Sequence, residues 1–203
     1  MTWVKICGIT SIAARDAAIR GGADALGFVL APGSPRHLEI PAARDLIRGI
    51  GIPTYVVVAD REPAAVVAVA KEVGASGIQA HGRTAAAVAA AALDSGFAVL
   101  RPIPVGPDGP TDEVTNVPDD ALPLFDTAST AVHGGTGRVF PWHVVAGVER
   151  PFVLAGGLGV DNVREAVAMA KPFGVDASSR LESAPGVKDP DTIISFIEEA
   201  KRS

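Results

Sequence analysis

The stretch from Val4 to Ser11, which reads VKICGITS, decides the fold class of this chain. It is a short apolar run of strand length that ends in a glycine turn, followed by Ser11, a residue type that caps helices. An open sheet that binds a dinucleotide carries G-x-G-x-x-G at this first turn. The turn here reads CGITS, so the opening strand argues against a doubly wound sheet.

Beyond this stretch, short apolar runs alternate with alanine-rich helical segments along the whole chain. About eight strand–helix units of roughly 25 residues each predict an α/β fold, a (β/α)₈ TIM barrel with eight parallel strands. Four prolines in or beside residues 108–119 predict a reduced or irregular fifth helix. No linker or low-complexity tract interrupts the pattern, so we expect residues 1–203 to form a single domain.

The composition supports this fold and excludes several classes of partner. Of the 203 residues, 48% are hydrophobic but only 5% aromatic, which indicates the aliphatic core of a parallel sheet covered on both faces. The net charge of −5, without a Lys/Arg cluster, argues against nucleic acid. No apolar run has the length of a membrane span, and a single cysteine fits a reducing compartment. We therefore expect a cytoplasmic protein with no membrane partner.

In such a barrel, the residues at the carboxyl ends of the strands are the functional candidates, because these ends meet at one face. The residues that follow the apolar runs are Cys7, Arg36, Gln79, His81, Arg101, Asp126, Gly134–Gly137, Gly156, Gly157, Ser178 and Ser179. We expect these residues to share one mouth of the barrel.

Cys7 and Asp126 are the candidates for proton transfer. A lone cysteine in an apolar strand is usually an inert small hydrophobe, but a thiolate at a strand end is a competent base. Asp126 directly follows the apolar run 121–125. It fits either a helix cap or a general acid whose pKa partial burial raises. From the residues alone, an inert buried Cys7 and a helix-capping Asp126 remain alternatives to the two catalytic roles.

The glycines after the last two strands are the candidates for anion binding. Gly156-Gly157 and the segment 174–179 follow the seventh and eighth apolar runs, where barrels of this class often bind phosphate through backbone N–H groups. Two ordinary turns are the alternative. The loop Gly134–Gly137 lacks the Lys-Ser/Thr ending of a P-loop, which disfavours nucleotide hydrolysis.

Arg36 lies on the second loop, where it is either a solvated surface residue or a bidentate donor to a substrate carboxylate. His81 follows the fourth strand and is a candidate for the pocket wall. The four histidines show no metal-ligand spacing, so we expect neither a metal site nor a cofactor.

Taken together, these motifs resemble the phosphoribosylanthranilate isomerase family of tryptophan biosynthesis, over nearly the whole chain. The opening VKICGIT with its cysteine is specific when the other motifs follow in order. Those motifs are SPR at 34–36, QAHG at 79–82, LFDT at 124–127, GGTG at 134–137, LAGGL at 154–158, GVDASS at 174–179 and PGVKD at 185–189.

The resemblance implies a cofactor-free Amadori rearrangement of N-(5′-phosphoribosyl)anthranilate to 1-(o-carboxyphenylamino)-1-deoxyribulose 5-phosphate. Asp126 would protonate the furanose ring oxygen, and Cys7 would remove the C2′ proton. Arg36 would bind the anthranilate carboxylate. The remaining predicted contacts are Gln79, His81 and Gly135 for the substrate, and Gly156, Gly157, Ser178 and Ser179 for its phosphate.

Two positions depart from the family pattern. Ala80 replaces a usual Leu, which predicts an altered pocket wall, and Arg180-Leu181 replaces Gly-Val, where Arg180 either obstructs the phosphate or adds a cation to it. One alternative is a histidine-pathway isomerase, although that family carries Asp where this chain has Cys7. A non-catalytic phosphate-ligand binding paralogue is the other. Monomer and homodimer both remain open.

Overall fold

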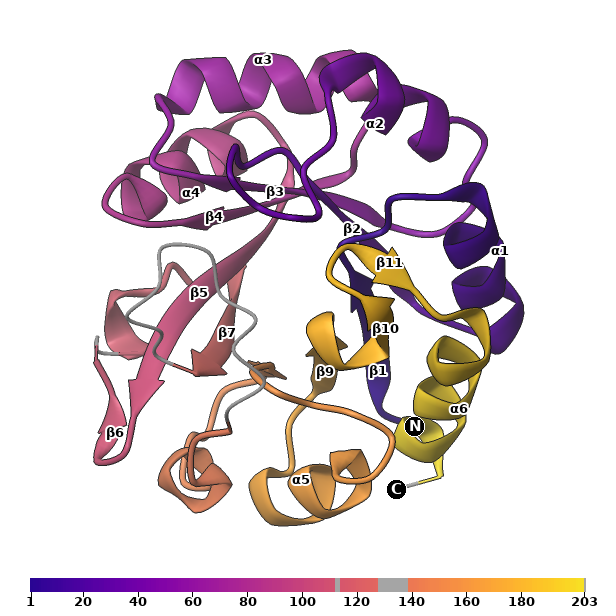
Figure 1. The fold of residues 1–203 in the computed structure, drawn as a ribbon. Helices are drawn as coiled ribbons and strands as arrows, with labels where there is room; N and C mark the ends of the chain where they lie inside the picture. Colours follow the sequence, from indigo (N-terminus) through magenta and orange to yellow (C-terminus); the bar gives the residue numbers. More distant parts are fainter. Residues whose placement is uncertain (112–113, 128–138, 203) are drawn as a thin grey trace.

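The strands close into a barrel in the computed structural model, which describes residues 1–111, 114–127 and 139–202. Figure 1 shows the strands as a ring with the helices outside it. Eight parallel strands pair in the order β1-β2-β3-β4-β5-β7-β8-β9, and β9 pairs with β1 to complete the ring. They are β1 (Trp3–Cys7), β2 (Ala25–Val29), β3 (Thr54–Ala59), β4 (Gly77–His81), β5 (Ala98–Gly106), β7 (Ala121–Thr127), β8 (Val153–Leu154) and β9 (Gly174–Ala177). The predicted eight-stranded parallel barrel is confirmed.

The helices begin and end where the sequence supplies caps. Ser11 Oγ accepts a hydrogen bond from Ala14 N at the start of the first helix, and Gly74 ends the third in the left-handed conformation. The α-helices of the described residues are α1 (Ile12–Gly21), α2 (Ile40–Ile47), α3 (Pro63–Val73), α4 (Ala85–Asp94), α5 (Val163–Ala170) and α6 (Pro190–Lys201). Among these residues, no helix combines the length and apolar composition needed to cross a bilayer.

Between β5 and β7 the expected helix is reduced, as the prolines predicted. The described part of this connection holds a short strand, β6 (Gly109–Pro110), which pairs back onto β5, and a single 3₁₀ turn, η1 (Val114–Asn116). The connection after β7 also ends in a 3₁₀ turn, η2 (Trp142–Val145).

Side chains alternate along the strands between two environments. Outward-facing residues such as Ile78 and Ala80 pack under the helices in the main core. Inward-facing residues such as Tyr55 and Leu124 fill part of the barrel interior. This alternation corrects the prediction for Ala80, which packs in the helix-side core instead of lining the mouth.

A short hairpin over the barrel was not predicted from the sequence. After β9, a 3₁₀ turn η3 (Ser179–Leu181) leads into β10 (Glu182–Ala184), which pairs with β11 (Val187–Lys188). Figure 1 shows this hairpin beside β1. Thr10 Oγ1, in the loop after β1, donates a hydrogen bond to Gly186 O, between β10 and β11 (2.8 Å). The hairpin therefore brings its own side chains to the mouth on the β1 side.

Candidate active site

A buried lysine forms the charged floor of the barrel mouth. The Lys5 side chain, from β1, is fully buried, and its Nζ donates to Gln79 Oε1 on β4 (2.9 Å) and to Asp176 Oδ2 on β9 (2.7 Å). Burial acts to lower the pKa of Lys5, but Asp176 and Cys7 together hold it above its usual value. This ammonium group therefore stays charged.

Gln79 extends this floor to His81 at the end of β4. The Gln79 Nε2 atom lies 3.0 Å from His81 Nε2. Burial lowers the pKa of His81 to about 4, and the charges of Lys5 and Arg101 act in the same direction. The ring is therefore neutral near pH 7, and its Nε2 can accept a hydrogen bond from the Gln79 amide. His81 lies at the strand end, as the sequence predicted, whereas Gln79 is the middle residue of β4 and not a residue that follows the strand.

Cys7 ends β1 and is 7% exposed. It packs against Gly27 of β2, where an added Cβ would lie only 2.8 Å from Sγ, so a glycine is needed opposite the thiol. Burial raises the pKa of the Cys7 thiol, and the Asp176 carboxylate adds to that rise. The ammonium groups of Lys5 and Lys188 act in the opposite direction.

Asp126 is the next-to-last residue of β7 and is partly buried. Gly156, with φ of +85°, approaches it so closely that a Cβ would lie 2.9 Å from Asp126 Oδ1. Burial raises the pKa of Asp126 to about 6, with a further contribution from the negative charge of Asp176. A substantial fraction of this carboxyl is therefore protonated close to neutral pH.

Arg36 is held by a carboxylate that the sequence did not reveal. Its Nε and Nη2 donate to the two oxygens of Glu182 in β10 (2.6 and 2.8 Å), and Lys188 Nζ donates to the same carboxylate (2.6 Å). Arg36 also packs on Gly8, where a Cβ would lie 2.5 Å from Arg36 Cδ and 3.0 Å from Ser178 Oγ. Arg36 is thus a fixed donor at the mouth.

The two predicted phosphate loops lie next to each other because β8 pairs with β9. The backbone N–H groups of Gly157 and Ser178 donate to no other described residue. Arg180 links the loops, since its Nη1 donates to Gly157 O (3.1 Å) and its Nη2 to Asp161 Oδ2 (2.9 Å). Lys188 Nζ also donates to Ser178 O (3.1 Å), so the loops offer free N–H donors beside two side-chain cations.

Comparison with known proteins decides which family carries this arrangement. A family model described as N-(5′phosphoribosyl)anthranilate (PRA) isomerase matches residues 4–199. The N-(5′-phosphoribosyl)anthranilate isomerase of Desulforudis audaxviator is 38% identical over 209 residues and covers 100% of both chains. The chain belongs to the N-(5′-phosphoribosyl)anthranilate isomerase family.

Solved members of the phosphoribosylanthranilate isomerase family have the same fold. The structure from Thermus thermophilus matches with a TM-score of 0.87 at 30% identity over 99% of each chain. Another, in complex with reduced 1-(o-carboxyphenylamino)-1-deoxyribulose 5-phosphate, matches with a TM-score of 0.83 at 29% identity over 100% of each chain. The predictions of a TIM barrel and of an isomerase of tryptophan biosynthesis are confirmed.

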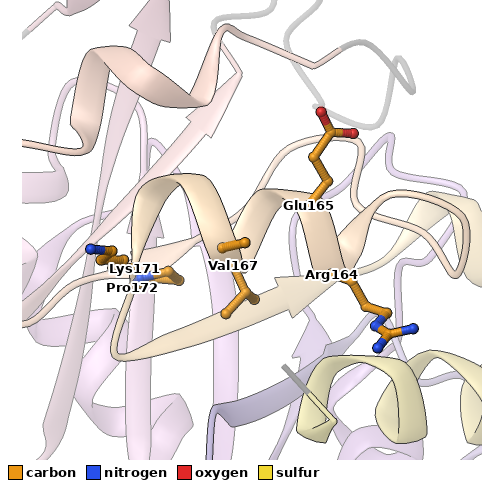
Figure 2. Close-up of a pocket in the computed structure, with 6 residues that line it drawn as sticks. Arg164, Glu165, Val167, Lys171 and Pro172 are labelled. Atoms are coloured by element: carbon orange, nitrogen blue, oxygen red, sulfur yellow. The ribbon is translucent and has the colours of Figure 1, made fainter.

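One predicted contact and one surface hollow are not part of the site described above. Gly135 and its loop lie outside the described residues. A hollow of about 600 Å³ lies on α5, lined by Arg164, Glu165, Val167, Ala168, Lys171 and Pro172, none of which is a predicted site residue. Figure 2 shows Arg164 and Glu165 pointing to opposite sides of this helix. Among the described residues, no three His, Cys, Asp or Glu side chains form a group suited to a metal ion.

Sequence reasoning missed four charged residues of the isomerase mouth: Lys5, Asp176, Glu182 and Lys188. Lys5 and Asp176 lie inside apolar runs, and a charge at an inward strand position was the signal that could have found them. Glu182 and Lys188 lie in strands of three and two residues, too short for a periodic pattern.

Proposed function

We propose that this barrel catalyses the Amadori rearrangement of N-(5′-phosphoribosyl)anthranilate, with Asp126 as the acid and Cys7 as the base. Asp126 gives its proton to the furanose ring oxygen, and the ring opens to an iminium. The Cys7 thiolate then removes the C2′ proton to give an enolamine, which relaxes to the ketone. The product is 1-(o-carboxyphenylamino)-1-deoxyribulose 5-phosphate, whose reduced form is the ligand bound to one solved family member.

The contrast in charge around the two residues carries this proposal. Burial raises the pKa of Asp126 to about 6, which keeps a proton available for donation. Burial raises the pKa of the Cys7 thiol as well, but the ammonium groups of Lys5 and Lys188 act against that rise and favour the thiolate. An acid and a base whose environments differ in this way are the usual arrangement for proton transfer in two steps.

Arg36 is proposed to bind the anthranilate carboxylate. Glu182 occupies Nε and one proton of Nη2, and Nη1 has no acceptor among the described residues. The end of the guanidinium therefore remains available for a second carboxylate while Glu182 fixes its plane. Gln79 and His81 offer a neutral polar surface for the sugar beside it.

The substrate phosphate is proposed to bind Gly156, Gly157, Ser178 and Ser179. The unused N–H groups of Gly157 and Ser178 support this assignment, because a phosphate needs several donors at close approach. Gly135 is kept as a proposed substrate contact from its motif alone.

The enzyme is proposed to work in the cytoplasm on this small substrate as one domain spanning residues 1–203, without cofactor, metal or nucleic acid. A single cysteine and a biosynthetic role support that compartment. A monomer or a homodimer fits the proposal, and light scattering on the purified chain distinguishes the two.

The decisive experiment follows the loss of phosphoribosylanthranilate fluorescence with the wild type, Cys7→Ala and Asp126→Asn. Each variant should lose about 10²–10⁴-fold in kcat, the usual contribution of a general acid or base. Asp45→Asn, an exposed aspartate on α2, is the matched control and should be unaffected. Full activity in Cys7→Ala would refute the base, and a wild type that binds the product analogue without turnover would favour a binding paralogue.

A further inference from the structure

Lys5 is a buried cation that the proposed proton transfers do not use. Its side chain is 0% exposed, and it is held by Gln79 and Asp176 inside the barrel. Placing an ammonium group in a protein interior is costly, and an apolar side chain would fill the same space in a barrel core. The charge therefore calls for an explanation in the chemistry of the mouth.

Lys5 lies directly beneath Cys7 on the same inward face of β1, because alternate residues of a strand point to the same side. The space beside Gly27 of β2 shows how close the two side chains are. A Cβ on Gly27 would lie 2.8 Å from Cys7 Sγ and 3.2 Å from Lys5 Cε. The thiol and the end of the lysine side chain therefore lie close together, on either side of the position that this Cβ would take. The aliphatic part of Lys5 thus leads toward the sulfur.

The hydrogen bonds of Lys5 leave one donor for that sulfur. An ammonium group has three N–H donors. One is taken by Gln79 Oε1 at 2.9 Å and one by Asp176 Oδ2 at 2.7 Å. The two acceptors come from β4 and β9, on opposite sides of β1 around the ring, and they hold the nitrogen in the barrel interior.

Other charged and titratable groups also face this part of the mouth. They are Asp176 on β9, Lys188 on β11, Arg36 after β2, Tyr55 on β3, His81 on β4 and Asp126 on β7. Lys188 and Arg36 share the Glu182 carboxylate, which offsets much of their charge. His81 is neutral near pH 7. Lys5 differs from Lys188 and Arg36 because its carboxylate partner, Asp176, also faces the thiol.

We propose that Lys5 is a positioning residue for the base, whose ammonium group stabilises the Cys7 thiolate while Gln79 and Asp176 fix its place. Lys5 keeps all three protons throughout the reaction, and the C2′ proton passes to sulfur. Asp176 sets how much of the positive charge the sulfur experiences. This inference deepens the proposed function, because it assumes Cys7 as the base.

The lone cysteine makes the test direct, because alkylation by iodoacetamide reports only on Cys7. The rate is measured against pH for the wild type, Lys5→Met, Asp176→Asn and the charge-balanced double variant with both changes. Loss of Lys5 should raise the pH midpoint by about one to three units, the size of a close opposite charge. Asp176→Asn alone should lower the midpoint. Lys71→Met, an exposed lysine near the end of α3, should leave it unchanged.

Kinetics supply the second readout. With the proposed role, kcat of the Lys5 variants at neutral pH falls about tenfold for each unit by which the midpoint rises, with little change in KM. A midpoint equal to that of the wild type in a folded Lys5→Met or double variant overturns the inference. If neither folds, the inference rests on Asp176→Asn, and an unchanged or raised midpoint there overturns it.

The outcome is separable from that of the proposed function. Full activity in Cys7→Ala would refute the base, whereas the alkylation midpoint would still show whether Lys5 controls the thiol.

Discussion

The two sides of the barrel mouth hold the proposed base and the proposed acid in opposite electrostatic surroundings. On the β1 side, burial and Asp176 raise the pKa of the Cys7 thiol, and the ammonium groups of Lys5 and Lys188 offset part of that rise. On the β7 side, Asp126 is influenced mainly by burial and by the negative charge of Asp176, and both raise its pKa.

The difference shows how one barrel supplies both proton-transfer roles. A carboxyl group normally gives up its proton far below neutral pH, and a thiol keeps its proton to higher pH. Burial favours the neutral form of both groups, and the two nearby ammonium groups offset part of this effect at Cys7. Substitutions on either side of the mouth and in the phosphate loops test this difference.

Removing the carboxylate of Glu182 should destabilise the cation-rich side most. In Glu182→Gln, the buried Arg36 and Lys188 lose their shared negative partner. Leaving buried charges unpaired costs about 3–5 kcal/mol of unfolding free energy. Urea denaturation at neutral pH measures the loss as a lower midpoint. Glu198→Gln, which removes an exposed carboxylate paired with Arg202, is the control. Equal midpoints would mean that Glu182 does not hold this side together.

The same pair has a pH dependence of known sign. Burial alone would raise the pKa of Glu182, but Arg36 and Lys188 hold it below its usual value of 4.5. A carboxyl with a lowered folded-state pKa stabilises the fold above its unfolded pKa. The stability gap between the wild type and Glu182→Gln should therefore be full near neutral pH and shrink as the pH falls below about 4.5.

Asp126→Asn should stabilise the fold while greatly reducing activity. The pKa of Asp126 is raised from 3.8 to about 6, so above pH 6 the folded state bears the cost of a buried charge. A shift of this size corresponds to about 2–3 kcal/mol. The variant should be more stable than the wild type at pH 7.5 by about this amount, and equal to it below about pH 4. A variant no more stable than the wild type at pH 7.5 would contradict the raised pKa.

A residue of this site could be predicted from the sequence only where it lies at a suitable place in its strand. Cys7, His81 and Asp126 sit at or next to the ends of their strands, and parallel strands bring such ends to one face. Their convergence could be predicted. The local pattern could not predict the partners, because ring order and register decide that Lys5 of β1 meets Asp176 of the neighbouring β9.

The carboxylate partner of Arg36 could not be predicted from the sequence. Arg36 was expected as a free donor to substrate, whereas Glu182 already holds its guanidinium. The two residues are 146 positions apart, and a hairpin with strands of three and two residues brings them together. Such a hairpin depends on contacts with β1 and its loop more than on its own propensities.

The pH profile of kcat/KM sharpens the contrast further. Burial raises the pKa of Asp126 to about 6 and holds that of Cys7 above its ordinary value, and the proposed mechanism uses the neutral carboxyl and the thiolate. Below pH 6 the rate rises about tenfold per unit, because only the thiolate fraction changes. Between the two pKa values the loss of neutral carboxyl offsets the gain of thiolate, and a plateau results.

The residual activity of Asp126→Asn tests this profile. Without the titrating carboxyl, kcat/KM should continue to rise about tenfold per unit through pH 6–8, where the wild type is flat. Fluorescence assays across this range measure both slopes. A plateau that persists in Asp126→Asn would assign the lower pKa to another group.

Replacing Arg180 should change only KM, and by little. The direction of that change decides whether Arg180 obstructs the phosphate or adds a cation to its site. Its guanidinium bonds to Gly157 O and Asp161, so it ties the two phosphate loops together beside their free N–H groups. Exposed pairs of this kind contribute about 1 kcal/mol or less, which limits the rise in KM of Arg180→Ala to about fivefold, with kcat unchanged. Arg164→Ala is the control, because it removes another surface arginine, which pairs with Glu199 of α6. A lower KM in Arg180→Ala would show that the side chain obstructs the phosphate, because removing a cation that helps to hold the loops cannot improve binding of an anion.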